Sequence, residues 1–229
     1  MHDSEALSRP AREPDAARAD LARERKKRGF DRFLLFTDAV VAIAITLLIL
    51  PVVERAAELG GGEELTIAAI LRESGPQIYG FLLSFAVIAV MWLRHQAIFQ
   101  VVETVNPWLV WANLGWLLTV IFLAFTTALT AQHGNESIAA PIYIGNVALN
   151  SLMLSLSATI LSRHPELMFA DTPSDAIHLS RSWVATGLLT FAVVLVLIVP
   201  SIGYYAMFLL FLQRPLIHLL VRAADRADA

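Results

Sequence analysis

Arg32-Phe-Leu-Leu-Phe-Thr-Asp-Ala-Val-Val-Ala-Ile-Ala-Ile-Thr-Leu-Leu-Ile-Leu-Pro51 is the stretch that decides the fold of this chain. It is apolar over about 20 residues, the length that crosses a bilayer. Its first third nevertheless carries an aspartate, Asp38. A carboxylate inside a membrane span costs about 2.5–3.5 kcal/mol on insertion scales. Asp38 must therefore find polar partners inside the protein or take part in its function.

The composition of the whole chain predicts an all-α, polytopic membrane protein. Hydrophobic residues make up 57% of the sequence and charged residues 16%, and the mean hydropathy is +0.62. Soluble domains are about one quarter charged. The sequence contains 0 cysteines, which excludes disulfides and thiolate metal sites. The histidines lack the spacing of metal ligands, so we expect no metal site and no cofactor. A net charge of −3 gives no reason to expect nucleic acid as a partner.

The hydrophobic segments predict six transmembrane helices. The last apolar block, residues 182–221, is about twice the length of one span. Pro200-Ser-Ile-Gly203 lies at its midpoint and predicts a hairpin between two helices, with one long kinked helix as the alternative. Residues 54–74 are polar and read as a loop with a short surface helix. The predicted spans are 30–53, 75–95, 107–131, 137–161 and the two halves of 182–221.

The placement of lysine and arginine predicts the orientation of these helices. Basic residues gather in the segments that share a side with the amino terminus, and the opposite side holds only Arg55 and Arg72. The positive-inside rule then places both termini in the cytoplasm of a multi-pass plasma-membrane protein. We expect residues 1–29 to be a solvated tail or a short surface helix. Residues 30–221 form the membrane domain, and residues 222–229 a short cytoplasmic tail.

Helix geometry separates the carboxylate of the first span from an aliphatic stripe. At about 100° per residue, Asp38 faces the opposite side of the helix from Leu47. The opposite side carries a sector of about 100° that contains Ile43, Thr46, Leu47 and Leu50. Asp38 is then a cation site, a proton sensor or a structural hydrogen-bond centre, and its position away from the stripe favours the third role.

Polar and aromatic residues of the first two spans are expected in one cytoplasmic layer, because the two helices run in opposite directions. His95 is the nearest plausible partner of Asp38 in that layer. Arg32 is six residues from Asp38 and does not face it on one helix, so it also reads as a positive-inside anchor. The layer contains Arg32, Asp38, Trp92 and His95.

These residues resemble the signature of a known family. Arg32-x-x-x-Phe36-Thr37-Asp38 is similar to the R-x-x-x-F-S-D motif that opens the first helix of the transmembrane protein 175 family of potassium channels, with threonine in place of serine. Leu83-Ser-Phe85 and Trp92-x-x-His95-x-x-x-Phe99 resemble the second helix of the family. Asn113-Leu114 fits the third more weakly, and Ala124-Phe125-Thr126-Thr127 departs from it. A single signature in 229 residues resembles the bacterial branch, which has one six-helix unit per chain.

The resemblance implies a homotetramer whose pore is lined by the first helix of each subunit. Ile43 would form the main constriction, Leu47 and Leu50 would lie beyond it, and Thr46 would contribute a ring of hydroxyls. Potassium and other monovalent cations would pass, with modest selectivity, because no loop resembles the carbonyl filter of ordinary potassium channels. The structural network of the signature would comprise Arg32, Phe36, Thr37, Asp38, Trp92 and His95.

Two other functional classes compete with the channel. A proton-coupled or other secondary transporter is the main alternative, because an intramembrane aspartate with a histidine, here Asp38 and His95, is a common device for proton relay. Neither internal repeats nor broken helices at mid-membrane support it. A membrane enzyme is not expected, because Asp38 is the one carboxylate inside the predicted spans once Asp31, at the very start of the first span, is set aside.

Overall fold

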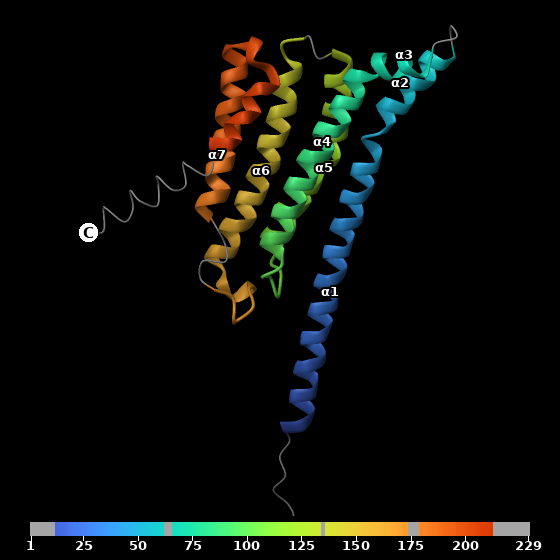
Figure 1. Cartoon of the computed structure of the whole chain (residues 1–229). Helices are drawn as coiled ribbons and strands as arrows, with labels where there is room; N and C mark the ends of the chain where they lie inside the picture. Colours follow the sequence, from blue (N-terminus) through green and yellow to red (C-terminus); the bar gives the residue numbers. More distant parts are fainter. Residues whose placement is uncertain (1–11, 62–65, 134–135, 174–178, 213–229) are drawn as a thin grey trace, which may run out of the picture.

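The chain forms a bundle of helices in the computed structural model, which describes residues 12–61, 66–133, 136–173 and 179–212 (Figure 1). The long helices run roughly side by side, and α1 extends well beyond one end of the bundle. The elements in chain order are α1 (Arg12–Leu47), α2 (Leu50–Gly60), α3 (Ile67–Glu73), α4 (Gly75–Phe99), α5 (Pro107–His133), α6 (Ala139–Arg163), η1 (Pro165–Leu167), α7 (Leu179–Ile198) and η2 (Pro200–Leu212).

The described part of the chain contains 5 helical segments long and apolar enough to cross a membrane. They confirm an all-helical membrane protein with several spans. The sixth predicted helix corresponds to a shorter apolar helix, Pro200–Leu210. The rest of that predicted span, residues 213–221, lies outside the described residues, so a count of six remains a prediction. The five segments are Arg28–Gly60, Gly75–Phe99, Pro107–His133, Ala139–Arg163 and Arg181–Ile198.

The first span has different limits from those expected. Helix α1 begins at Arg12 and is continuous through residues 12–29, which were expected to belong to a tail or a short surface helix. At its other end α1 stops at Leu47, and α2 begins at Leu50 with Pro51 in its first turn. A proline has no backbone N–H and clashes with the carbonyl four residues earlier, so it interrupts a helix at this point.

Helices α2 and α3 lie at the opposite end of the bundle from the amino terminus and lean away from the other helices (Figure 1). Thr66 starts α3, and its Oγ1 accepts a hydrogen bond of 3.3 Å from the N–H of Ala69. Neither helix contains a buried residue. Helix α3 is therefore a short peripheral helix, in the segment where a surface helix was expected.

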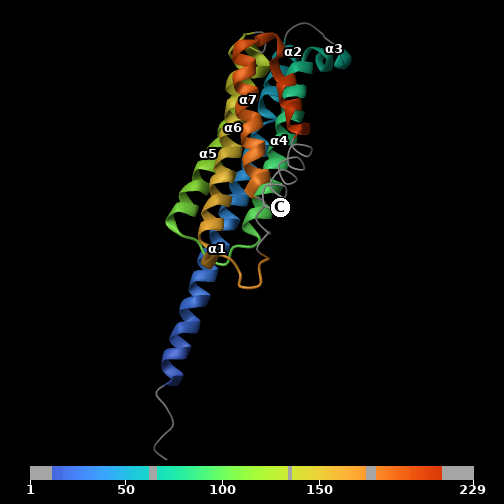
Figure 2. The ribbon, with the colours of Figure 1, turned by 90° about the vertical axis from the view of Figure 1, so that its left-hand side faces the viewer.

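The core is formed by α5, α6 and α7, with α4 and α1 packed against them (Figure 2). Helix α6 contributes the largest share of buried residues, among them Tyr143 and Leu154. Trp116 of α5 has no exposed surface. Helix α1 joins this core through Val41 and Ala44, which are 3% and 2% exposed.

The last part of the bundle reverses direction at Gly203. Its φ of 50° lies in the left-handed region, which glycine adopts without steric cost. Helix α7 ends at Ile198, and η2 packs back against α6 and α7. The ring of Tyr204 meets that of Tyr143 edge to face at 5.8 Å. This segment is therefore a hairpin, and not one long kinked helix.

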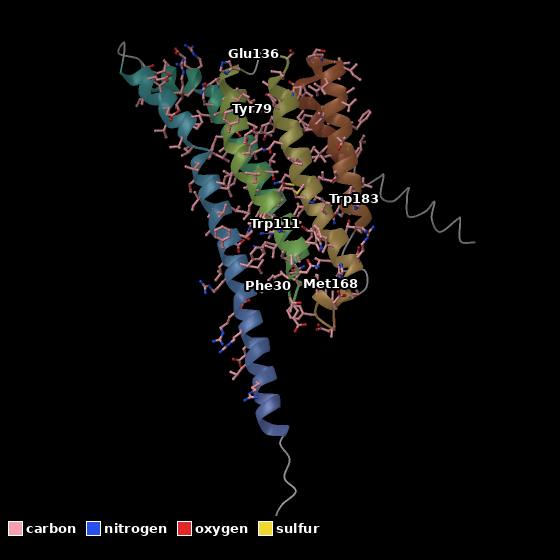
Figure 3. The ribbon with its side chains drawn as sticks, turned by 180° about the vertical axis from the view of Figure 1, so that it is seen from behind. Phe30, Tyr79, Trp111, Glu136, Met168 and Trp183 are labelled. Carbon is pink, nitrogen blue, oxygen red and sulfur yellow. The ribbon has the colours of Figure 1, made fainter. Side chains whose placement is uncertain are left out.

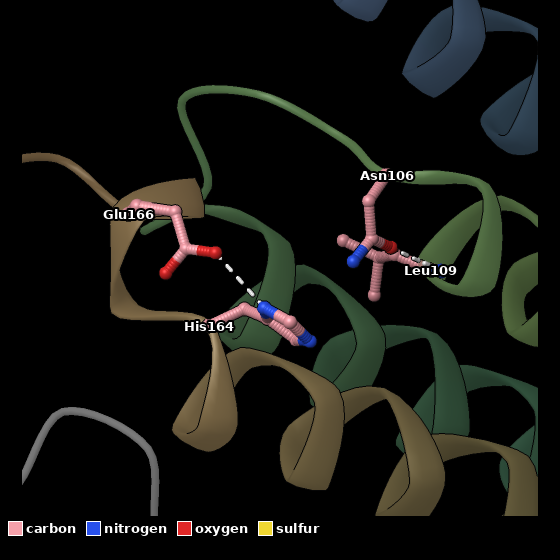
Figure 4. Close-up of polar contacts among 4 residues, drawn as sticks. All are labelled: Asn106, Leu109, His164 and Glu166. Atoms are coloured by element: carbon pink, nitrogen blue, oxygen red, sulfur yellow. Dashed lines mark hydrogen bonds and ion pairs between the residues drawn. The ribbon is translucent and has the colours of Figure 1, made fainter.

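The connections at the amino-terminal end of the bundle are fixed by local polar contacts (Figure 4). The Oδ1 atom of Asn106 accepts a hydrogen bond of 2.8 Å from the N–H of Leu109 at the start of α5. The Nδ1 atom of His164 lies 2.9 Å from Oε1 of Glu166 in η1. A backbone N–H and this histidine together lower the pKa of the exposed Glu166 carboxyl.

Candidate functional site

Helix α1 has two faces with different surroundings. One face is buried against the rest of the chain through residues spaced three, four or seven apart, the period of one helix side. Phe30 belongs to this face and lies at the same end of the bundle as Met168, while Tyr79 and Glu136 mark the other end (Figure 3). The buried face consists of Phe30, Thr37, Val41 and Ala44, and Leu48, just after the end of α1, is buried as well.

The opposite face of α1 carries Ile43, Thr46 and Leu47 of the predicted aliphatic stripe and is uncovered in the single chain, and Leu50 follows at the start of α2. The side chains of Ile43, Leu47 and Leu50 are 59%, 43% and 46% exposed. Thr46 is also exposed, and its Oγ1 donates a hydrogen bond of 2.7 Å to the carbonyl of Ile43. The oxygen lone pairs of Thr46 thus remain free to face whatever adjoins this surface. Such an apolar face borders either lipid or other copies of the helix.

A directed chain of hydrogen bonds joins the buried face of α1 to α5 and α4. The hydroxyl of Thr37 donates to the carbonyl of Phe33 at 3.0 Å, so it must act as acceptor toward Nδ2 of Asn113, 2.9 Å away. The Oδ1 of Asn113 then faces Nε2 of His95 at 2.7 Å, and this nitrogen must carry the hydrogen. The contacts thus assign the Nε2–H tautomer to His95. All three side chains are buried.

His95 is held between two aromatic rings as well as by this hydrogen bond. Its ring stacks on Phe99 and on Trp116 with centroid distances of 4.2 Å in both cases. The indole N–H of Trp116 donates to Oδ1 of Asn150 on α6 at 3.0 Å. The amide of Asn150 donates in turn to Thr119 at 2.7 Å. Hydrogen bonds and ring stacking together therefore connect α1 through α5 and α4 to α6.

Asp38 does not pair with His95, contrary to the expectation from the sequence. Its Oδ1 accepts hydrogen bonds from Nε1 of Trp92 at 2.9 Å and from Nε2 of Gln96 at 2.8 Å. Residues 92 and 96 are one helical turn apart, so both reach α1 from the same side of α4. His95 is turned toward α5 instead. The carboxylate is thus anchored by two neutral donors.

The predicted signature residues fall into two groups. Thr37, Asp38, Trp92 and His95 lie in the contact between α1, α4 and α5. Arg32 and Phe36 are exposed, and Phe36 has an exposed fraction of 53%. Neither residue joins the hydrogen-bonded group, by which we mean Thr37, Asp38, Trp92, His95, Gln96 and Asn113.

Sequence reasoning missed two polar members of this site and gave a third too little weight. Gln96 carried a detectable signal, because it follows Trp92 by one helical turn and faces the same way. Asn113 was noticed only as a weak motif residue, although it links Thr37 to His95. Asn150 is a buried amide inside an apolar segment, and such residues need a partner. Within the described ranges, the structure contains no group of three or more His, Asp or Glu residues suited to a metal ion.

Comparison with known protein families matches the first half of the helical bundle to a family model. Residues 32–123 match the family model described as "Endosomal/lysosomal potassium channel TMEM175". This range covers α1 from Arg32 onward, α2 to α4 and the larger part of α5. It contains the hydrogen-bonded group around Asn113 and the stripe on α1.

Several proteins of known name are similar to this chain. A potassium channel of Chamaesiphon minutus is 37% identical over 118 residues, which cover 50% of this chain and 57% of the relative. A potassium channel of Streptomyces collinus is 32% identical over 129 residues, covering 56% and 61%. The "Endosomal/lysosomal proton channel TMEM175" of Danio rerio is 29% identical over 153 residues, covering 66% and 28%. The matches therefore span less than two thirds of each relative.

One solved structure is similar over nearly its whole length. It is the crystal structure of a lysosomal potassium-selective channel TMEM175 homolog from Chamaesiphon minutus. The TM-score is 0.61 at 27% sequence identity, and the match covers 87% of this chain and 98% of that chain. The likeness thus extends beyond the range of the family model into the later helices.

Proposed function

We propose that this chain, a member of the TMEM175 family, forms a potassium-permeable cation channel. The family match, the named bacterial relatives and the solved homologue support a channel. They do not favour the transporter alternative or suggest an enzyme. The single observation that carries the proposal is the uncovered aliphatic face of α1, which lies opposite a face anchored by buried polar contacts.

The proposed pore is lined by α1 from each of four subunits. A helix that is packed on one side and apolar and exposed on the other suits a position around a central axis. Ile43 forms the main constriction, Leu47 lies further along the same face of α1, and Leu50 lies beyond it at the start of α2. Thr46 contributes hydroxyl oxygens, whose lone pairs are free because the hydrogen is donated to the helix backbone.

The proposed mechanism is hydrophobic gating. Four aliphatic side chains narrow the pore until water leaves, and conduction then needs only a small dilation. Potassium sheds its hydration more easily than sodium, so an apolar neck favours it modestly. Monovalent cations are the permeating species in this scheme, and no cofactor takes part.

The hydrogen-bonded group on the other side of α1 has a positioning role in this proposal. Thr37 and Asp38 hold α1 against α4 and α5, and the stacked His95 ties both to α6 through Trp116. These contacts fix the rotation of α1 about its own axis. Ile43 projects from one side of α1 only. A rotation of the helix about its own axis therefore turns this side chain away from the pore axis. Asp38 acts here as a structural centre and not as a cation site.

The orientation is also part of the proposal. The basic residues around Arg28 and Arg32 precede the apolar part of α1, and the positive-inside rule places them in the cytoplasm. Both termini are then cytoplasmic in a plasma-membrane protein.

Potassium flux into liposomes that contain the purified full-length protein tests this function. We expect uncoupled flux from the wild type and a larger flux from Ile43→Asn, because a polar ring removes the dewetting barrier. Leu118→Asn is the matched control, since Leu118 of α5 is similarly exposed, at 66%, but lies off the α1 face. It should leave the flux unchanged. Absence of flux from a folded, oligomeric wild type would contradict the channel, and an unchanged flux in Ile43→Asn would place the gate elsewhere.

A further inference from the structure

The uncovered face of α1 does not end with the aliphatic stripe. Helix α1 runs without interruption from Arg12 to Leu47. Arg25, Arg28 and Arg32 are exposed on it, on the amino-terminal side of Ile43. We define these three arginines as the arginine face.

The arginine face is in register with the proposed constriction. At about 100° per residue, its three arginines fall within a sector of about 60° around the helix, and Ile43 lies inside the same sector. Arg32 precedes Ile43 by about 16 Å along the axis and Arg25 by about 27 Å. If α1 lines a pore, as proposed above, the arginines of each chain line its entrance.

Nearby carboxylates reduce this positive charge only in part. Glu24 and Asp31 are exposed but lie about 40–60° beyond one edge of the sector. The ion pair between Arg28 and Glu24 has an N–O distance of 3.9 Å, and both side chains are 68% exposed. Such a long, solvated ion pair has a small interaction energy and neutralises little of the charge of Arg28. The face therefore keeps a net positive charge, which several subunits multiply around one axis.

The chemistry of the face selects an anion with several phosphate groups. A guanidinium group presents a planar fork of donors that matches phosphate oxygens in pairs. Several such groups facing one axis suit a ligand with charges spread over more than one phosphate. A vestibule with walls of low dielectric constant also concentrates ions of opposite charge. The ligand is a soluble polyphosphate anion and not a lipid, because the axis-facing side of α1 is turned away from the bilayer.

We propose that the arginine face is a binding surface for soluble polyphosphate anions at the pore entrance, and that their binding raises cation flux. Unoccupied, the arginines repel cations from the entrance. This repulsion acts at the pore entrance and not at Ile43. Charges are screened within about 8 Å at physiological salt, and Arg32 lies about 16 Å from Ile43 along the helix axis. A bound polyanion reverses the local charge and restores the concentration of cations there. This inference rests on the proposed function, which brings the arginines of several chains around one axis, and binding of the anion is therefore measured separately from flux.

Pyrophosphate is the probe for the first test, calorimetric binding to the purified full-length protein. The variant is Arg25→Gln/Arg28→Gln, which leaves the signature residue Arg32 in place. The charge-matched control is Arg72→Gln/Arg163→Gln, which removes two exposed arginines that lie off α1. We expect wild type and control to bind pyrophosphate and the variant to bind roughly tenfold more weakly or not at all. Circular dichroism and size-exclusion chromatography verify that all three proteins fold alike.

The second test measures potassium flux in vesicles of neutral phosphatidylcholine, with pyrophosphate added on the side of the arginine face. We expect a severalfold increase for wild type and control and none for the variant. Normal flux without pyrophosphate binding would overturn the inference and leave the proposed function intact. Equal binding by wild type and variant would place the anion elsewhere and overturn it too. Binding that is lost in the variant, with no flux in any protein, would uphold the anion surface and reject the channel.

A further comparison distinguishes phosphate groups of lipid headgroups from a soluble polyphosphate anion. The flux of the wild type is compared in neutral vesicles and in vesicles containing phosphatidylglycerol, both without pyrophosphate. Stimulation by phosphatidylglycerol together with no response to pyrophosphate would overturn the proposal in favour of a lipid surface. Equal flux in the two kinds of vesicle, with stimulation by pyrophosphate, supports the soluble anion.

Discussion

Asn113 stands between Thr37 and His95, with its amide nitrogen 2.9 Å from the Thr37 hydroxyl and its amide oxygen 2.7 Å from the His95 ring. Because the Thr37 hydroxyl already donates to the carbonyl of Phe33, the amide can lie only one way round. The position therefore requires a side chain that donates on one side and accepts on the other. Asparagine meets this demand, and its near isostere aspartate does not.

Asn113→Asp should destabilise the protein strongly. A carboxylate would present an oxygen to the lone pairs of Thr37 and bury a charge at a site with 0% exposure. We expect the free energy of unfolding to fall by about 3 kcal/mol or more. Thermal unfolding of the detergent-solubilised protein measures it. Asn106→Asp is the matched control, because Asn106 uses only an acceptor oxygen at the start of α5, and aspartate serves there equally well. Equal unfolding temperatures for both variants would refute the directed chain.

Much of the fold follows from hydropathy, which is a local property of the chain. Helices α4, α5 and α6 begin within two residues of their predicted starts, because long apolar runs bounded by polar segments leave little freedom. Helix α1 begins well before the predicted span, at Arg12, although its membrane segment starts at Arg28, within two residues of the prediction. Its first part is polar and reads as solvated, although nothing in it forbids a helix that continues outward from the membrane. Pro51 is a local signal for the end of a helix. It was passed over because the predicted span, residues 30–53, had the length of one membrane crossing and included it.

The candidate site shows where such reasoning stops. Trp92 and His95 were expected near Asp38, but Gln96 was missed, Arg32 lies outside the contact, and the pairing was not predicted. Whether Trp92, His95 or Gln96 reaches α1 depends on the rotation of α4 about its axis, which α5 and α6 set. His95 faces Asn113 because the stack with Trp116 holds it there. Pairing between helices is thus a property of the packed bundle.

The role of Asp38 is tested by two substitutions at the same position. Asp38→Asn keeps an oxygen that accepts from Trp92 and Gln96, whereas Asp38→Ala leaves both donors without an acceptor. We expect Asp38→Ala to cost about 1–3 kcal/mol and Asp38→Asn much less. Asp38→Ala should also lower the oligomer yield in size-exclusion chromatography more than it alters ion selectivity. Normal assembly of both variants with lost potassium preference would instead assign the charge of Asp38 to the permeating ion.

The hydroxyl of Thr46 offers a test of the exposed face that leaves its shape unchanged. Thr46→Val keeps the volume but removes the lone pairs, and Thr46→Ser keeps the hydroxyl. If this face borders permeating cations, Thr46→Val should lower potassium flux in liposomes several-fold, and Thr46→Ser should preserve it. Serine at 46 still donates to the carbonyl of Ile43, so helix geometry is the same in the comparison. Indistinguishable flux from the two variants would indicate that Thr46 faces lipid.

Gly29 joins the outer part of α1 to its membrane part and tests whether the helix is continuous. No atom lies within 4 Å of a Cβ placed at Gly29, so Gly29→Ala should stabilise the helix by up to about 1 kcal/mol. Gly29→Pro removes the backbone hydrogen bond from residue 29 to the carbonyl of Arg25. It should lower the stability of the helix by about 3 kcal/mol. Trypsin cleavage after Arg25 in the folded protein is the measurement. We expect slower cleavage in the alanine variant and faster cleavage in the proline variant than in the wild type.

The same pair of variants separates the position of the arginine face from its charge. Gly29→Pro leaves every arginine in place but turns Arg25 and Arg28 out of register with Ile43, because a proline bends or breaks the helix at this point. Stimulation of flux by pyrophosphate should therefore fall in Gly29→Pro and persist in Gly29→Ala. Equal stimulation in both would mean that charge near the membrane suffices, whatever its direction. Continuity of α1 would then have no part in the response to anions.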